Sequence, residues 1–228
     1  MEKLLKAFSL NKTEVCLFTF VFTLIGLGRY FAVTNPDYFN TVYTVEDGLL
    51  ENITVLFLFF GSLVCWNRSL KLRHEKPKLF VVMCFMLGAL FLFGAGEEIS
   101  WGQRIFNVQT PEFFKAHNIQ HETNIHNLVV NGVKINKLIF GLILGVLIAV
   151  YVLILPLLHA KIPKIRSLID SFAIPLPRFI HILFYLALFI IVETTPSSKK
   201  GEMVEFGGAA IFVLIVLFPR NWHIFRRQ

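Results

Sequence analysis

Several patterns typical of soluble enzymes and metalloproteins are missing from this sequence. Its three cysteines form no CxxC pair and no Cys/His spacing of a zinc site. Because Cys16, Cys65 and Cys84 all lie inside apolar runs, we expect buried, inert thiols without a disulfide framework. No nucleophile elbow surrounds Ser100. No local catalytic motif therefore identifies a reaction.

Apolar residues dominate instead. Hydrophobic residues make up 55% of the 228 residues, aromatic residues 14%, with 25 phenylalanines among them. The mean hydropathy is +0.65, which lies outside the range of soluble globular domains. The composition predicts an all-α, polytopic integral membrane protein.

Six apolar segments approach the length of about 20 residues that a membrane-spanning helix needs. We expect them to form one transmembrane domain over residues 1–228. The predicted spans cover residues 15–33, 49–66, 79–96, 138–158, 176–192 and 203–218. The first predicted span is preceded by basic residues, as in a signal peptide, but no A-x-A-like cleavage site comes after it. We therefore interpret it as an uncleaved anchor. Residues 97–137 form the long outer loop.

The basic residues predict the orientation. If the N-terminus is cytoplasmic, the inner segments hold Lys3, Lys6, Lys12, Arg68, Lys71, Arg73, Lys76, Lys78, Lys161, Lys164, Arg166, Arg178, Arg220, Arg226 and Arg227. The positive-inside rule then places both termini in the cytoplasm of a bacterial inner membrane. The net charge of +7 is explained by membrane lipids as partners. We expect no nucleic acid partner, because the basic residues are split among short segments without a recognition motif.

The acidic residues show the opposite distribution. At or beyond the outer boundary lie Asp37, Glu46, Asp47, Glu51, Glu97, Glu98, Glu112, Glu122, Glu193, Glu202 and Glu205. Acids contribute little to topology, so this bias needs another explanation. Glu51, Glu97 and Glu205 approach the hydrocarbon layer, where an unpaired charge is costly. Glu193 and Glu202 fit ordinary solvated helix ends.

The outer loop begins with GAGEEISWGQRIF. If the preceding helix continues, Glu97, Ser100, Trp101 and Arg104 share one face by their i, i+3, i+4, i+7 spacing. Arg104 can then pair with a carboxylate or bind a phosphate. We favour an interfacial position in the membrane for Trp101 over a role in chemistry.

Two further stretches of the loop are informative. In QTPEFFKAHN, Thr110 suits an N-cap and Pro111 the first turn, which predicts a short interfacial helix. In HETNIHN, a helix would make Glu122 and His126 i, i+4 neighbours. That pair suits a metal site or a general acid/base pair. A solvated Glu–His surface pair is the common alternative.

These motifs carry a resemblance. GEEISWGQR and ExNxHN, together with EDGxxE before the second span and KGExxE before the last, resemble an uncharacterised family of bacterial multi-pass membrane proteins. The resemblance covers most of the chain and implies no reaction. It marks Glu46, Asp47, Glu51, Glu97, Glu98, Ser100, Trp101, Gln103, Arg104, Glu122, Asn124, His126, Asn127, Glu202 and Glu205. A distant similarity to alkaline ceramidase-like membrane hydrolases is incomplete, because the last helix has no HxxxH pair.

Three classes of function remain. The first is a metal- or acid/base-dependent hydrolase or transferase on a lipid or lipid-linked substrate, for which the catalytic candidates are Glu97, Glu98, Glu122, His126 and Arg104. Its cofactor would be a divalent metal, with Glu51, Glu97, His126 and Glu205 as candidate ligands. The second is a proton- or cation-coupled transporter, although no inverted repeat is evident. The third is a structural or accessory subunit.

Overall fold

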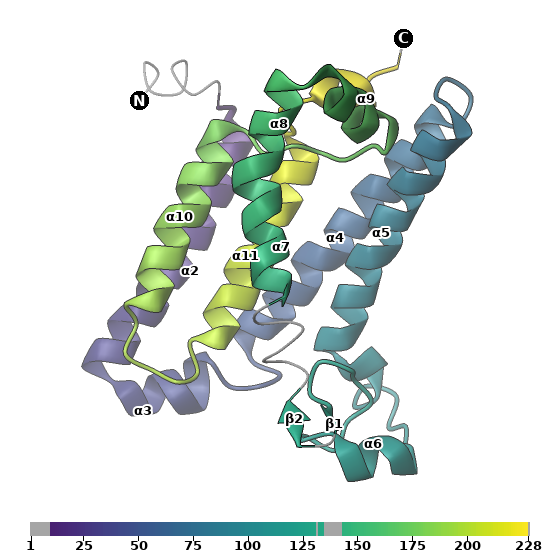
Figure 1. The fold of residues 1–228 in the computed structure, drawn as a ribbon. Helices are drawn as coiled ribbons and strands as arrows, with labels where there is room; N and C mark the ends of the chain where they lie inside the picture. Colours follow the sequence, from purple (N-terminus) through teal and green to yellow (C-terminus); the bar gives the residue numbers. More distant parts are fainter. Residues whose placement is uncertain (1–9, 131, 135–142, 228) are drawn as a thin grey trace. The chain divides into compact units, whose positions relative to one another are not determined.

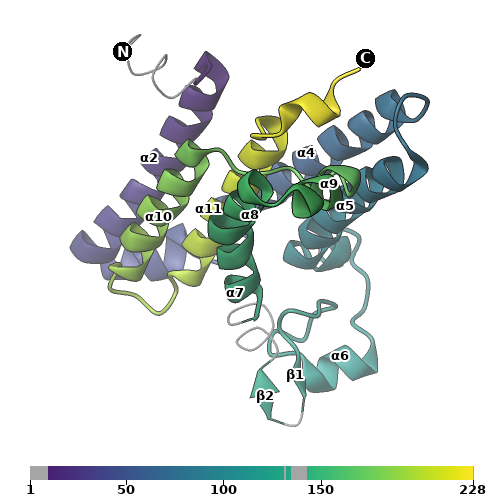
Figure 2. The ribbon, with the colours of Figure 1, turned by 45° about the horizontal axis from the view of Figure 1, so that its top comes forward.

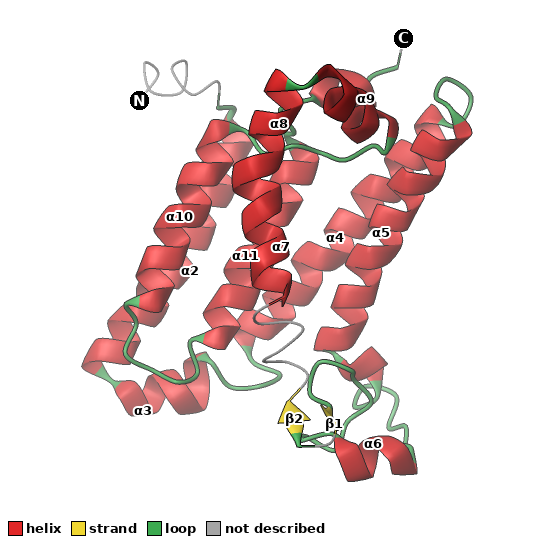
Figure 3. Cartoon of the chain, viewed as in Figure 1, coloured by secondary structure: helices red, strands yellow, loops and turns green. Residues whose placement is uncertain are grey.

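The computed structural model describes residues 10–130, 132–134 and 143–227. Helices make up most of it, joined by loops and one short hairpin (Figure 3). The all-α prediction is confirmed. The chain divides into two compact units, and α4 (Leu49–Leu72) begins in the first and ends in the second. Unit 1 comprises Met1–Phe57 and Pro177–Arg220, and unit 2 comprises Leu58–Leu176 and Asn221–Gln228.

Unit 1 is built on three helices, α2 (Lys12–Thr34), α10 (Phe179–Glu193) and α11 (Gly201–Leu217). These helices pack against one another, with Phe18, Ile180 and Leu214 in a shared cluster. A short α3 (Pro36–Tyr38) and a π-helical segment, Phe39–Tyr43, follow α2. α11 is the most buried helix of this unit, as expected of a helix that is apolar on all sides.

A buried charge joins α2 to α10. Asn11 caps α2 reciprocally with Glu14, which is fully buried. A Glu14 oxygen lies 2.6 Å from Arg178 Nη2 and 3.6 Å from Nε2 of the buried His181. The sequence placed Arg178 on the cytoplasmic side without predicting this contact. Because a buried carboxylate needs a cation and hydrogen bonds, this cluster fixes the two helices together.

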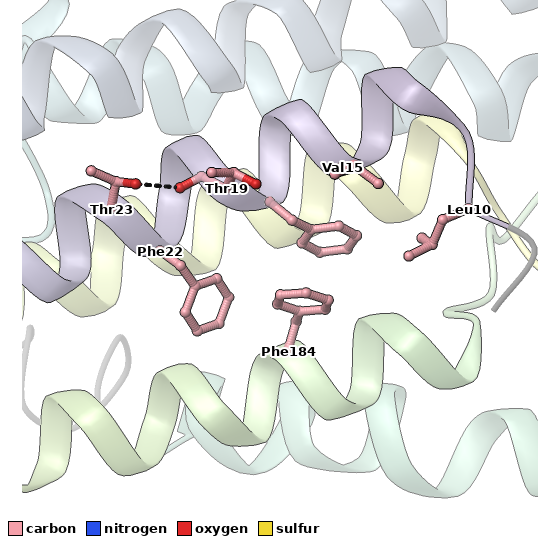
Figure 4. Close-up of a pocket in the computed structure, with 7 residues that line it drawn as sticks. Leu10, Val15, Thr19, Phe22, Thr23 and Phe184 are labelled. Atoms are coloured by element: carbon pink, nitrogen blue, oxygen red, sulfur yellow. Dashed lines mark hydrogen bonds between the residues drawn. The ribbon is translucent and has the colours of Figure 1, made fainter. Parts of the chain in front are cut away.

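An apolar groove of about 430 Å³ runs between the same helices. Its lining includes Val15, Phe22 and Phe184, and Figure 4 shows the Phe184 ring reaching from α10 toward α2. Phe18 stacks on Phe184 with ring centroids 3.8 Å apart. The groove is therefore a feature of aromatic packing along this helix pair.

Unit 2 holds the end of α4, α5 (Lys78–Glu98) and the segments that follow (Figure 1). The Ser69 hydroxyl donates to the Val81 carbonyl, and the Trp66 indole to the Phe85 carbonyl, which ties α4 to α5. After α5 come α6 (Glu112–His117), strands β1 (Val129–Val130) and β2 (Val133–Lys134), and later α7 (Leu144–Ala149), α8 (Leu155–Lys161) and α9 (Pro163–Ser171). The two strands pair antiparallel.

A π-helical segment, Val150–Ile154, joins α7 to α8 just before Pro156. Proline has no N–H to continue the α-helical ladder, which accounts for the irregular turn. The sequence did not predict α9, a short amphipathic helix. Its Asp170 side chain accepts a hydrogen bond from Asn221 and lies 3.0 Å from His159, so α8, α9 and the chain after α11 meet here.

Within the part of the chain that the structure describes, three helices are long and apolar enough to cross a membrane, namely Lys12–Thr34, Leu49–Leu72 and Lys78–Glu98. Two shorter apolar helices cover Gly145–Lys161 and Phe179–Glu193. The first three predicted spans lie within these long helices, whose ends extend beyond the predicted ones. Residues 138–142 of the fourth predicted span, and Lys3 and Lys6, lie outside the described residues. Burial is confirmed for Cys65 and Cys84, but the expectation for Cys16 is wrong, since it is exposed on α2.

Candidate functional site

The candidate site lies in residues 99–128, which we call the α5–β1 segment; it contains α6 and precedes the hairpin (Figures 1 and 2). α5 ends at Glu98 because the chain then turns into the left-handed region, with φ of 46° at Ser100, 56° at Trp101 and 73° at Gly102. Two successive non-glycine residues in this region are strained. The condition under which Glu97, Trp101 and Arg104 would share one helical face is therefore not met, and the helix ends two residues after the predicted span.

Glu97, in the last turn of α5, is a carboxylate bonded to the segment at several points, with only 4% of the residue exposed. Its Oε1 accepts the Trp101 indole N–H at 2.9 Å. Its Oε2 accepts the backbone N–H of Ile125 at 2.6 Å and that of His126 at 3.2 Å. The end of α5 is thereby joined to the 118–128 loop, since buried carboxylates persist only when hydrogen-bonded.

His126 lies directly beside this carboxylate. Its Nδ1 is 3.6 Å from Glu97 Oε2, and its side chain is 25% exposed. Its Nε2 is 2.9 Å from the Asn127 amide nitrogen, which can only donate. With that amide oriented as in the structure, Nε2 accepts, and the proton of a neutral imidazole is on Nδ1, facing Glu97. Glu97 and His126, both named as catalytic and metal-ligand candidates from the sequence, therefore lie side by side.

Glu122 belongs to a different cluster. Its Oε2 accepts the Ser100 hydroxyl at 2.5 Å and lies 2.7 Å from Arg104 Nη2. The pairing of Arg104 with an acid is thus confirmed. The helix that would have made Glu122 and His126 neighbours is absent, because this stretch forms turns. Each residue pairs instead with a group some 20 or more positions away in the sequence.

Buried amides connect the two clusters. The Asn124 amide donates to the Ser100 hydroxyl at 2.9 Å, and Asn118 donates to the Asn124 side chain at 2.8 Å. Asn127 donates to Gln120 at 2.6 Å, and Gln103 accepts from the Thr123 backbone at 2.8 Å. Sequence reasoning missed Asn118 and Gln120. The only signal for them is the density of amide side chains between positions 118 and 127.

α6 confirms the predicted short helix, but its start differs. The helix begins at Glu112, and Pro111 occupies the N-cap position without a side-chain hydrogen bond. Thr110, predicted as the N-cap, instead accepts a hydrogen bond from the Gln103 amide at 2.5 Å. The threonine hydroxyl therefore supports the turn after α5 instead of the helix.

The other candidate acids have separate surroundings. Glu98 ends α5 and is half-buried. Glu51, in unit 1, accepts the Asp47 backbone N–H at 2.6 Å and so supports the start of α4. Glu205 is exposed on α11, also in unit 1. The two units are described separately, so a shared site of Glu51 and Glu205 with Glu97 and His126 stays a prediction.

The solvent exposure of each polar side chain limits the reactions that the segment can support. Ser100 is fully buried and bonded to Glu122 and Asn124, so its hydroxyl cannot meet a substrate without rearrangement. His126 and Arg104 are partly exposed, at 25% and 37% of their side chains. Among the described residues, no group of three or more His, Cys, Asp or Glu side chains is placed to hold a metal ion. Proton transfer and anion binding are the chemistry that these exposed groups support.

Comparisons with known proteins add no assignment. No family model matches the chain, and no curated protein and no solved structure is significantly similar to it.

Proposed function

We propose that the chain is a polytopic protein of the bacterial inner membrane, with six spans and both termini in the cytoplasm. Support comes from the three long apolar helices and the two shorter ones, and from the distribution of lysine and arginine. We expect cysteines at positions 40 and 115 to react with an impermeant maleimide from outside, and one at position 76 only after the inner face is opened. Labelling of position 115 only from the cytoplasm would refute this orientation.

We further propose that the α5–β1 segment acts on a lipid or lipid-linked substrate as a hydrolase or transferase. In this proposal His126 transfers a proton, Glu97 orients the imidazole, and Arg104, held by Glu122, contacts an anionic headgroup. The observation that carries the proposal is the buried Glu97 carboxylate 3.6 Å from Nδ1 of the partly exposed His126. A carboxylate behind an imidazole fixes the ring and stabilises the imidazolium that forms when the ring takes a proton.

The position of this pair suits such a substrate. Glu97 lies in the last turn of α5, a helix apolar enough to cross a membrane, so its end is expected near the headgroup layer. The candidate metal set of Glu51, Glu97, His126 and Glu205 remains an untested extension. Both Glu97 oxygens already accept protein donors, which favours acid/base chemistry over metal ligation.

The experiment compares membrane lipids from cells that produce the wild type, His126→Gln or His117→Gln. His117 is an exposed histidine of the same segment whose Nδ1 contacts only its own helix carbonyl, at Phe113, so it is a matched control. We expect the wild type and His117→Gln to alter the same lipid species in mass spectra, and His126→Gln to leave it unaltered. If His126→Gln is present at the wild-type level and causes the same change, the enzymatic proposal fails.

A structural or accessory role is favoured by a separate observation. The buried polar side chains of the segment bind one another, as in the Asn118–Asn124–Ser100 chain. Such a closed network specifies a conformation without requiring chemistry. If Glu97→Gln and His126→Gln both disappear from the membrane, this role should replace the enzymatic one. Proton or cation transport stays a prediction from the acidic residues alone.

A further inference from the structure

The α5–β1 segment buries some of its polar side chains while exposing large apolar ones. Ser100 is fully buried, and Asn124 and Asn118 are 1% and 3% exposed, whereas other polar residues such as Asn107 and Glu112 are exposed. Six large apolar residues are also exposed. Their exposed fractions are 72% for Ile105, 74% for Phe106, 58% for Val108, 55% for Phe113, 48% for Ile119 and 41% for Ile125. A loop surrounded by water normally shows the reverse arrangement.

The inner polar groups meet the condition for lying in an apolar medium. Backbone and side-chain groups there must be bonded within the protein, because the surroundings offer no hydrogen bonds. The Glu97 carboxylate, the Ser100 hydroxyl and the Asn118 amide all have protein partners. The segment can therefore lose water on its outside without leaving these groups unbonded.

The apolar exterior is continuous with the surface of α5. Trp101, half exposed, has its ring 5.6 Å from that of Phe93, which is itself exposed on α5. The Trp101 ring also lies over Gly96, where a Cβ would come within 2.9 Å of it. The surface that a membrane-crossing α5 presents to lipid thus extends through Trp101 onto the segment.

We propose that the α5–β1 segment is embedded in the bilayer at the boundary between headgroups and acyl chains, with Phe106 and its apolar neighbours inserted among the acyl chains. The occupant of this surface is the lipid leaflet, because the surface continues that of a candidate membrane span and the buried polar groups beneath it are bonded within the protein. The proposal concerns placement and is independent of any reaction at His126.

The test uses the full chain with Cys16→Ser, a single added cysteine, and an environment-sensitive fluorophore attached to it. Phe106→Cys reports the proposed inserted surface, and Val108→Cys is a second reporter in case the first variant does not fold. Glu112→Cys is the matched control, since Glu112 is exposed and polar in the same segment. The unmodified background, whose Cys65 and Cys84 are buried, gives the signal to subtract.

Each labelled protein is reconstituted in phosphatidylcholine vesicles, with nitroxide-bearing phosphatidylcholine as the membrane quencher and iodide as the aqueous one. We expect iodide to quench the probe at position 106 at least about threefold less than that at 112, since inserted elements lie several ångströms below the headgroups. The nitroxide-bearing lipid should quench the probe at position 106 more strongly than the probe at position 112. Equal iodide quenching at 106, 108 and 112, with no effect of the nitroxide lipid, would place the segment in water. If the probe at position 106 loses its protection from iodide as the protein-to-lipid ratio falls, the surface is covered by a second copy of the protein, which would also refute the proposal.

Discussion

Replacing Glu97 by glutamine should loosen the contact between α5 and the 118–128 loop while leaving both units folded. The amide oxygen can still accept from the Ile125 and His126 backbone N–H groups. Its NH₂ group must then face the Trp101 indole, which is itself a donor. An unsatisfied buried donor costs about 1–3 kcal/mol, and bonds to a neutral oxygen are weaker than bonds to a carboxylate.

The magnitude can be read directly from hydrogen exchange. A loss of about 1–3 kcal/mol corresponds to roughly 5- to 150-fold faster exchange of the 125 and 126 amides, at a factor of ten for every 1.4 kcal/mol. Mass spectrometry of a peptide covering residues 119–128 would detect it in detergent. Trp101→Phe is the matched control, because it removes one donor but leaves both backbone bonds to Glu97, so acceleration should be smaller. Equal protection of these amides in the wild type and in Glu97→Gln would refute this account of the carboxylate.

The other predictions concern separate contacts. Arg178→Ala should destabilise the protein by about 3–5 kcal/mol, because it leaves the fully buried Glu14 without its arginine; thermal unfolding in detergent measures this, and recovery in Glu14→Gln/Arg178→Met would confirm the cause. Arg104→Ala should cost less than about 1 kcal/mol, since the arginine is 37% exposed; a loss as large as that of Arg178→Ala would contradict this. Burial raises the pKa of Tyr43 from its ordinary value of 10.0 to about 12. The Tyr43 hydroxyl therefore stays protonated to higher pH in the folded state than in the unfolded state. Its contribution to the free energy of unfolding is present below pH 10 and is lost as the pH rises to about 12. Tyr43→Phe should reduce the loss of stability between pH 10 and 12, and an unchanged dependence of stability on pH would contradict this prediction.

The helices could be predicted because their signal is local. Runs of apolar residues identified α2, α4 and α5, and the structure extends α2 to a start capped by Asn11 and α5 to Lys78 and Glu98, polar residues that hydropathy alone does not mark. The amphipathic α9 was missed because a helix of nine residues gives little periodicity.

The candidate site could be predicted only as a set of residues. Glu97, Arg104, Glu122 and His126 were recognised from residue type and position, but their partners were assigned by helical spacing. The left-handed turn at Ser100 and Trp101 removes the helical spacing after Glu97, and the turns around Asn124 remove that between Glu122 and His126. Nothing in a single sequence indicates that two successive non-glycine residues adopt positive φ, so the contacts that form across these turns were not foreseeable.

The hydrogen bonds of Glu97 also have a consequence for biosynthesis. Ile125, whose N–H binds its carboxylate, comes 28 positions later in the chain. If α5 crosses a membrane, as we propose, the Trp101 indole, four residues away, is the nearest of these donors in sequence when the helix inserts. The carboxylate is therefore expected to stay near the aqueous boundary until the loop has been synthesised and folds back onto it, since a charge deeper in the bilayer would oppose insertion. The position of Glu97 at the very end of α5, one residue before the last, is compatible with that delay.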